Sequence, residues 1–379
     1  MNQQEKVAAL QEVIRIQSVN GNETQVADYL SKLLKAHGID SQKVHFDEGR
    51  DSLVAVIQKG TGDKVLGLSG HMDVVDAGNE KDWTYPPFEA TIEGNKLYGR
   101  GSTDMKSGLV AMVFAMIELK ESQVDFNGRV KLLATVGEEV GELGAEQLTR
   151  EGYADDLDGL IIGEPTNYSL MYAHMGSINY SVVSAGKEAH SSMPQYGFNA
   201  INHLNEFITT VNQEMAHIAE TYVNEELGRT IHNVTVIHGG NQVNSIPGKA
   251  MLQGNIRSIP EYDNQKIIAL LQKIVDDLNQ EVEYKLELRI DFNKIPVKAD
   301  KDSALIQSIQ AQFDTPLPLV TAAGTTDAAE FTKSKNPFDV VVFGPGVPTL
   351  PHQVDEYVEI DNYLDMIDKY KAVALHYLK

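Results

Sequence analysis

The chain contains no cysteine among its 379 residues. Disulfide bonds and thiolate metal sites are therefore excluded, and histidine and carboxylate side chains remain as the strong metal ligands. Long apolar runs are also absent, so no segment predicts a membrane span. No apolar stretch follows a basic start at the N-terminus, which argues against a signal peptide. We therefore expect a cytoplasmic protein.

Basic residues are scarce as well. The chain has 32 lysines and arginines against 54 aspartates and glutamates, which gives a net charge of -22. Nucleic acids and anionic membranes are themselves negative, so neither is expected as a partner. The acidic residues are spread along the chain and form no acidic tail, so solubility explains most of them.

The length predicts two domains. In residues 1–175 and 293–379, short apolar runs bounded by glycine alternate with helical patterns, which is typical of an α/β domain with a mostly parallel sheet. Residues 176–292 show strands with one polar face, which predicts an antiparallel sheet with two helices. We expect a catalytic domain interrupted by this smaller α+β insert. Helices are predicted at 4–17, 104–120, 199–216, 263–279 and 303–313, and strands at 231–238, 250–257, 283–292 and 339–343.

Four of the apolar runs end, after a small residue or a turn, in a histidine or a carboxylate. Residues 65–70 lead to His71, 131–137 to Glu138 and Glu139, 160–163 to Glu164, and 340–343 to His352. The carboxyl ends of parallel strands meet at one edge of a sheet, where ligands bind. Four such placements of metal-ligand residue types predict a single metal site and a metal-dependent hydrolase.

Two further acids have a structural and a functional interpretation. Asp73 lies two residues after His71, so its carboxylate can accept the second ring N–H of His71 and fix the histidine tautomer. Taken alone, this pair favours an ordinary hydrogen-bonded histidine. Asp104 opens the predicted helix 104–120, where a carboxylate can cap free N–H groups without any metal.

The adjacent Glu138 and Glu139 are harder to explain without a cation. Two carboxylates after a buried strand repel each other, and burying them without a counter-ion costs several kcal/mol. One can bind a metal while the other accepts a proton from water, as metal-assisted hydrolysis requires. One zinc ion takes three or four protein ligands, and the chain offers five candidates. Two ions that share Asp104 explain the five better than one ion does. The candidates are His71, Asp104, Glu139, Glu164 and His352.

These stretches resemble the co-catalytic zinc aminoacylases and carboxypeptidases. The matching segments are 69–75, 99–108, 137–139, 163–166 and 344–346 with His352, in family order over nearly the whole chain. The resemblance implies two zinc ions per subunit, replaceable by cobalt or manganese. It implies that one ion is held by His71 and Glu164, the other by Glu139 and His352, with Asp104 as the bridge, Glu138 as general base and Asp73 orienting His71.

The resemblance also extends to the insert and to one turn beyond it. It implies a homodimer formed through the insert, which would act as a dimerisation or lid domain, with His190 reaching the partner's active site to stabilise the oxyanion. It further implies that Arg257 grips a substrate carboxylate, that Asn244 lines the site, and that the amides of Gly324 and Thr325 complete the pocket. From the residues alone, one of 11 histidines favours a surface or hydrogen-bonded role for His190, and the 324–327 segment is an ordinary turn before a helix.

We therefore expect hydrolysis of the amide bond of a small N-acyl amino acid. Within the family, the motif spacing and the Gly-Glu-Pro-Thr segment are most similar to the desuccinylase and deacetylase branch. Succinyl-diaminopimelate, an intermediate of lysine biosynthesis, is the first expected substrate, acetylornithine the second, and a small peptide the third. Nothing in the chain physically separates these substrates. A non-catalytic metal-binding protein is the remaining alternative, although the base Glu138 is present.

Overall fold

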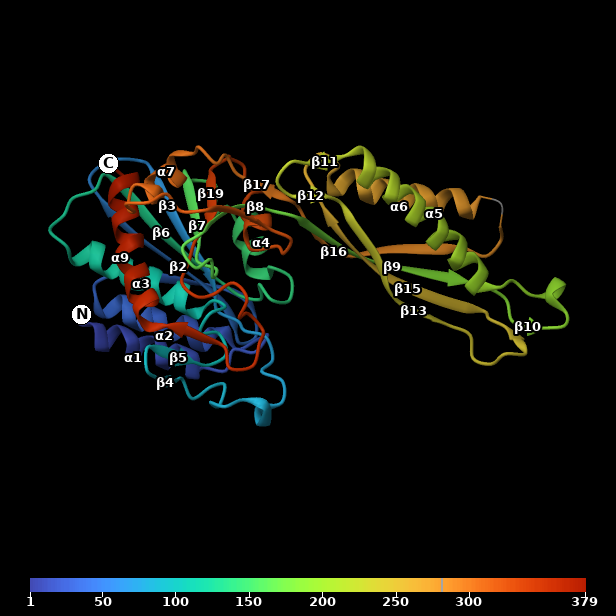
Figure 1. Cartoon of the computed structure of the whole chain (residues 1–379), viewed down its shortest axis with the longest axis horizontal. Helices are drawn as coiled ribbons and strands as arrows, with labels where there is room; N and C mark the ends of the chain where they lie inside the picture. The colour runs from blue at the N-terminus through green and yellow to red at the C-terminus, as the bar shows by residue number, and fades with distance from the viewer. Residues whose placement is uncertain (281) are drawn as a thin grey trace. The chain divides into compact units, whose positions relative to one another are not determined.

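The computed structural model describes residues 1–280 and 282–379, and these form two compact units (Figure 1). The first unit comprises Met1–Tyr172, Ala299–Val320 and Thr326–Lys379. The second comprises Ala173–Lys298 and Thr321–Thr325. The first unit is therefore discontinuous in the sequence, and one short segment, 321–325, belongs with the second unit although it lies well beyond the expected insert.

The largest sheet among the described residues has nine strands and forms the core of the first unit. Its order is β1 (Ser41–Asp47), β2 (Arg50–Lys59), β6 (Gly128–Thr135), β3 (Val65–His71), β7 (Gly159–Ile162), β19 (Asp339–Val342), β8 (Leu170–His174) and β17 (Val297–Lys298), and β18 (Leu319–Ala322) pairs with β8. Strands β6, β3, β7 and β19 are mutually parallel, and the flanking strands are antiparallel. The four parallel strands are the four apolar runs of the sequence. The predicted parallel core is confirmed.

Helices explain why these strands are apolar on both faces. The helices of the first unit are α1 (Gln3–Arg15), α2 (Glu23–Ala36), α3 (Lys106–Glu121), α4 (Leu143–Arg150), α7 (Ala304–Gln310), α8 (Ala328–Phe331) and α9 (Ile360–Tyr377). Helix α3 contacts β3, α1, α2 and α9, and nearly all its residues are buried. Every residue of β3 and β7 is buried, and apart from Ser69 and His71 of β3 these residues are apolar or glycine. The Ser69 hydroxyl donates to the Leu133 carbonyl at 2.9 Å, so its burial is compensated by a hydrogen bond.

A small sheet brings two distant segments of the first unit together. It consists of β4 (Thr91–Glu93), β5 (Lys96–Tyr98) and β20 (Tyr357–Glu359), with β20 antiparallel to β5. This pairing holds the segment after His352 against the loop that follows Tyr98 and contains Asp104. A single 3-10 turn, η1 (Glu80–Asp82), lies in the preceding connection.

The second unit is an antiparallel sheet with two helices, as predicted. The sheet order is β13 (Ile231–Gly239), β15 (Lys249–Ser258), β9 (Gly176–Ala185) and β16 (Leu286–Lys294), and the helices are α5 (Ala200–Thr221) and α6 (Asn264–Asn279). Alternate strand residues, such as Tyr180 and Leu252, pack with Phe207 of α5 and Leu271 of α6 in one apolar core. Gly254 lies opposite Tyr180, whose ring leaves no room there for a β-carbon. Short elements complete the unit: β10 (Ala189–His190), β14 (Ser245–Ile246), β11 (Val223–Asn224), β12 (Gly228–Arg229) and η2 (Pro194–Tyr196).

Some predicted boundaries are wrong. Helix α3 begins at Lys106, so Asp104 lies in the turn before the helix and does not cap it. Helix α7 ends at Gln310, three residues early, because the Gln310 side chain bonds both the N–H and the carbonyl of Leu317 and fastens the chain that turns away. The strand predicted at 283–292 is β16, shifted to 286–294.

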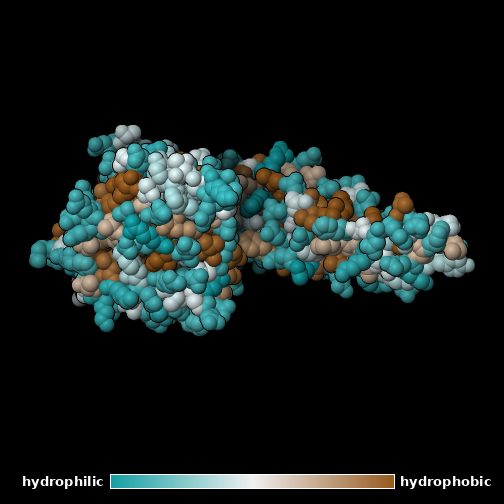
Figure 2. Space-filling view, turned by 90° about the horizontal axis from the view of Figure 1, so that it is seen from below, coloured by the Kyte–Doolittle hydropathy of each residue, from teal (hydrophilic) through white to brown (hydrophobic). Residues whose placement is uncertain are grey.

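The face drawn in Figure 2 is mainly hydrophilic, with apolar residues in scattered groups. Within the described part of the chain, no helix has the length and apolar character to cross a membrane.

Candidate metal centre

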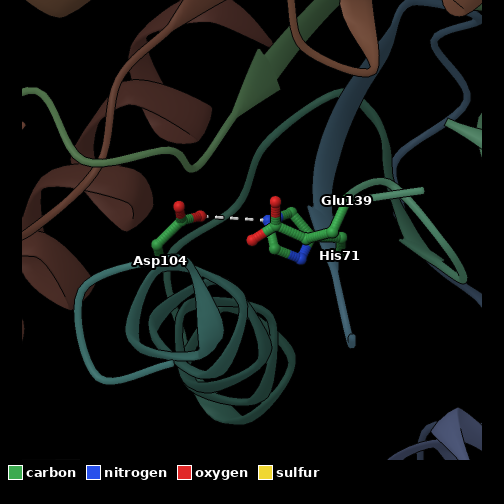
Figure 3. Close-up of side chains that lie close together, drawn as sticks. All are labelled: His71, Asp104 and Glu139. Atoms are coloured by element: carbon green, nitrogen blue, oxygen red, sulfur yellow. Dashed lines mark hydrogen bonds and ion pairs between the residues drawn. The ribbon is translucent and has the colours of Figure 1, made fainter. Parts of the chain in front are cut away.

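The parallel strands bring the expected ligands together at one edge of the sheet. His71 is the last residue of β3, Glu138 and Glu139 follow β6, and Glu164 follows β7. Asp104 reaches the same place from the turn before α3, and Figure 3 shows its carboxylate directed at His71, with Glu139 beside them. Ligating atoms of His71, Asp104 and Glu139 lie within 4.8 Å of one another, as do those of His71, Glu138 and Glu164.

Asp104 lies between two histidines. Its Oδ1 is 3.1 Å from Nε2 of His71, and its Oδ2 is 3.5 Å from Nε2 of His352. Glu164 Oε1 is 3.4 Å from the same His71 nitrogen, and both carboxylate oxygens of Glu139 are 3.1 Å from the His352 nitrogen. Two histidine–carboxylate groups therefore share one aspartate, each through a different oxygen.

The site concentrates negative charge in a buried place. Burial and the neighbouring Asp104 carboxylate raise the pKa of Glu164 to about 8. Burial, with the charges of Glu164, Asp327 and Glu139, also raises the pKa of Glu138 well above its usual range. Such carboxyl groups either stay protonated or are ionised beside a cation, and a bound cation would favour the ionised form.

The histidines respond in the opposite direction. Burial would lower the pKa of His71, but Glu164 and Asp104 raise it well above the ordinary value. Hydrogen bonds with Asp104 and Glu139 raise the pKa of His352 to about 10. Burial also opposes ionisation of Asp104, yet these two histidines hold its pKa below the usual range. In each histidine, the Nε2 proton stabilises the charge of the neighbouring carboxylates. A metal ion bound in place of that proton would have the same effect.

Asp73 acts differently from the expectation. Nδ1 of His71 is 2.9 Å from the main-chain carbonyl oxygen of Asp73 and 3.6 Å from its carboxylate, so the carbonyl accepts the ring N–H. Strand β3 ends at His71, and the same-face argument therefore does not reach residue 73. The two carboxylate oxygens of Asp73 instead accept the backbone N–H groups of Glu138 and Glu139, each at 3.1 Å. Asp73 therefore holds the loop that carries both glutamates.

Further buried polar residues support the site, and sequence reasoning missed them. Glu23, paired with Arg50, accepts the N–H of Gly137 just before the two glutamates. Asp327 accepts the hydroxyl of Thr135 at the end of β6. Arg100 and Glu356 form a third group, described below. Glu356 follows His352 by four residues, but no pattern in the sequence pointed to its role.

The remaining predicted residues lie in the second unit. His190 and Asn244 are neighbours, because β10 pairs with β14 and the N–H of Ser191 donates to the Asn244 carbonyl at 3.0 Å. Arg257 is on β15, and Gly324 and Thr325 are in segment 321–325. The contribution of these five residues to the metal centre stays a prediction.

The donor set fits divalent metal ions. It offers two imidazoles and four carboxylates, and their ligand atoms are close enough for several of them to bind the same ion. The Asp73 carbonyl accepts the Nδ1–H of His71, which leaves Nε2 free to bind a metal. Hard oxygen donors with imidazole nitrogen suit zinc, cobalt and manganese.

Comparison with known proteins gives a consistent picture. A model of Peptidase family M20/M25/M40 matches residues 67–376. A Staphylococcus epidermidis protein named "Probable succinyl-diaminopimelate desuccinylase" is 42% identical over 406 residues, covering 100% of this chain and 99% of that protein. An M20 family metallo-carboxypeptidase from Sulfolobus solfataricus superposes with a TM-score of 0.81 at 20% identity, covering 100% of both chains. A dinuclear metal-binding M20 peptidase from Bacillus subtilis has a TM-score of 0.74 at 13% identity, covering 99% of this chain and 98% of that one.

The raised pKa of Glu164 predicts that this side chain destabilises the protein when metal is removed. An acid whose folded pKa of about 8 exceeds its ordinary 4.5 costs nothing below pH 4.5, and stability is lost as the pH rises from 4.5 to 8. At pH 8, Glu164→Gln should therefore stabilise the chelator-treated protein by about 2–4 kcal/mol in urea unfolding. With excess zinc, the wild type should become the more stable protein, because it keeps the ligand.

The exposed Glu93→Gln on β4 is the matched control and should change neither measurement. Equal stability of Glu164→Gln and wild type at pH 8 without metal would show that Glu164 is not under electrostatic strain.

Proposed function

Because the chain belongs to Peptidase family M20/M25/M40, we propose that it is a dinuclear zinc hydrolase that removes the succinyl group from N-succinyl-diaminopimelate. The observation that carries the substrate assignment is the 42% identity, over the full length of both chains, to a protein named for this activity. The reaction adds water across the amide bond and yields succinate and diaminopimelate. We place it in lysine biosynthesis and in the cytoplasm, as the sequence predicts.

The ligand assignment follows the contacts around Asp104. We assign His71 and Glu164 to one ion, Glu139 and His352 to the other, and Asp104 to both. The support is that the two Asp104 oxygens face different histidines, and that each histidine has a second carboxylate of its own. When bound, the ions would lower the pKa of water and polarise the substrate carbonyl.

Glu138 is the proposed general base. It takes a proton from the attacking water and returns it to the nitrogen of the leaving amine, which completes the hydrolysis without net proton change at Glu138. Burial raises the pKa of Glu138 above its usual range, which makes its carboxylate a stronger base than an exposed glutamate. Asp73 supports the assignment, because its carboxylate accepts the backbone N–H groups of Glu138 and Glu139 and so fixes the main chain that presents both side chains.

Arg257 is the proposed ligand of a substrate carboxylate. It lies on the sheet face opposite the helices, in register with Ser177 of β9. Its guanidinium has no ion-pair or hydrogen-bond partner within residues 1–280 and 282–379, whereas Arg50, Arg100 and Arg129 are each paired with an acid. A half-buried unpaired arginine in so acidic a chain is suited to binding an anion.

The second unit is the proposed dimerisation and lid domain. Strand β13 is an edge strand of the four-stranded sheet, and its residues Ile231 and Ile237 are about half exposed. An exposed apolar edge strand is a surface that pairs readily across a two-fold axis. We propose that a homodimer forms there and that His190 completes the active site of the partner subunit.

A substrate panel tests the activity. Succinyl-diaminopimelate should be hydrolysed with a higher kcat/KM than acetylornithine, acetylmethionine or simple dipeptides, and a chelator should abolish the reaction. Glu138→Gln should reduce turnover at least about a hundredfold while zinc content stays at the wild-type value, since a base is lost but no ligand. Loss of zinc in this variant would mean that Glu138 and Glu139 have exchanged roles. Preference for another substrate would refute the desuccinylase assignment but would leave the metal-dependent hydrolase assignment intact.

Arg257→Ala should raise KM for carboxylate-bearing substrates. Loss of a charge-assisted pair costs about 2–4 kcal/mol, which corresponds to about a thirtyfold to thousandfold increase. Arg257→Lys should recover only part of the lost substrate affinity, because a lysine ammonium cannot make the two parallel hydrogen bonds of a guanidinium. The matched control is Gln253→Ala on the same strand face. Unchanged KM in Arg257→Ala would place the carboxylate elsewhere.

Mixing two inactive variants tests the dimer. If His190 acts in the partner's site, Glu138→Gln and His190→Ala should complement when refolded together, because one site of each heterodimer has both residues intact. The expected activity is up to about half the wild-type value per heterodimer. Subunit exchange is verified by mass spectrometry, and an exchanged but inactive mixture would show that His190 does not act in the partner's site.

A further inference from the structure

A buried carboxylate organises the loop that presents Asp104. Glu356 is fully buried, and its Oε1 accepts three backbone N–H groups, from Gly101 at 3.1 Å, Thr103 at 2.8 Å and Asp104 at 3.0 Å. Three N–H groups directed at one oxygen determine the course of this loop. The position of the Asp104 backbone therefore depends on a residue 252 positions away in the sequence.

The partner of Glu356 reaches the other ligand loop. Arg100, also buried, donates from Nη1 to Glu356 Oε2 at 2.6 Å and to the Gln353 carbonyl at 3.1 Å. From Nη2 it donates to the His352 carbonyl at 3.3 Å and to the Asp76 carbonyl at 3.4 Å. One guanidinium thus binds the main chain at His352 and the carboxylate that holds Asp104.

We propose that Arg100 and Glu356 are positioning residues that set the separation of Asp104 and His352, and thereby the affinity of the centre for its metal ions. Neither touches the proposed ions. The inference rests on the proposed function for the ligand assignment only, and it is independent of the substrate. His352 has a left-handed backbone with φ of 66°, a conformation that a non-glycine residue keeps only when its surroundings hold it.

Fold stability alone does not require this pair. Two buried opposite charges are often no more stabilising than apolar residues of the same volume, because both lose their hydration. What the pair supplies is geometry: a carboxylate that accepts several N–H groups and a planar fork that reaches several carbonyls. An apolar pair could replace neither function.

Zinc titration of the chelator-treated protein tests the proposal. Wild type should bind two ions. Glu356→Gln should weaken zinc binding at least about tenfold, as loss of residues that orient metal ligands typically does. Arg100→Lys keeps the charge but not the fork, and it should weaken the ion at His352 more than the ion at His71. Excess zinc should restore kcat with KM near the wild-type value, which a general structural defect would not show.

The matched control is Glu118→Gln. Glu118 on α3 pairs with Lys6 and Lys371, and it touches neither ligand loop. This variant should lose stability in urea unfolding yet keep both zinc affinities. Circular dichroism verifies folding of every variant, and Arg100→Lys decides the question if Glu356→Gln does not fold.

The outcomes separate this inference from the proposed function. Wild-type zinc affinities in folded Glu356→Gln and Arg100→Lys would overturn the positioning role while leaving the hydrolase assignment intact. Weakened zinc binding in the variants, together with no activity of the zinc-loaded wild type toward succinyl-diaminopimelate, would support the positioning role and refute the substrate assignment. If the wild type binds only one ion, the dinuclear assignment fails. Weaker binding of that ion in the variants would still support the positioning role, and unchanged binding would overturn it.

Discussion

Electrostatic repulsion among buried carboxylates is the constraint on which the rest of this structure depends. Asp104, Glu138, Glu139 and Glu164 converge at one sheet edge with two histidines among them. Burial disfavours the charged forms of Glu138 and Glu164, and repulsion from the neighbouring carboxylates adds to that cost. A divalent ion removes both costs, so the geometry that makes the apoprotein unfavourable is the one that makes metal binding strong.

Main-chain N–H groups provide the second means of holding this site. Asp73 accepts two from the 138–139 loop, Glu23 accepts one from Gly137, and Glu356 accepts three from the 101–104 loop. In each case an acid binds the backbone of a ligand loop and leaves the ligand side chain free. The loops are therefore positioned before any ion arrives, which lowers the ordering cost of binding.

The two units solve different problems. The first buries a parallel sheet between helices, and this provides a rigid edge from which short loops can present ligands. The second has one sheet face packed against α5 and α6 and the other face polar, with Arg257 and Asn255 on it.

The strands of the parallel core, and the histidine and carboxylate residues that follow them, could be predicted from the sequence. Runs such as 65–70 and 160–163 are apolar at every position, which is possible only for strands covered on both faces, and a ligand type follows each of them. The alternating pattern of 176–184 likewise identified a sheet with one polar face. Such patterns are local, so they can be read without knowledge of the partners.

How these side chains are oriented and held could not be predicted, because it depends on contacts between loops that are distant in the sequence. The two oxygens of Asp104 face different histidines because loops from three parts of the chain meet there, and the carbonyl of Asp73, rather than its carboxylate, accepts the His71 proton. Arg100 and Glu356 lie 256 residues apart, and neither periodicity nor motif spacing relates them. Hydrogen-bond direction depends on the dihedral angles of irregular loops, which leave no repeat in the sequence.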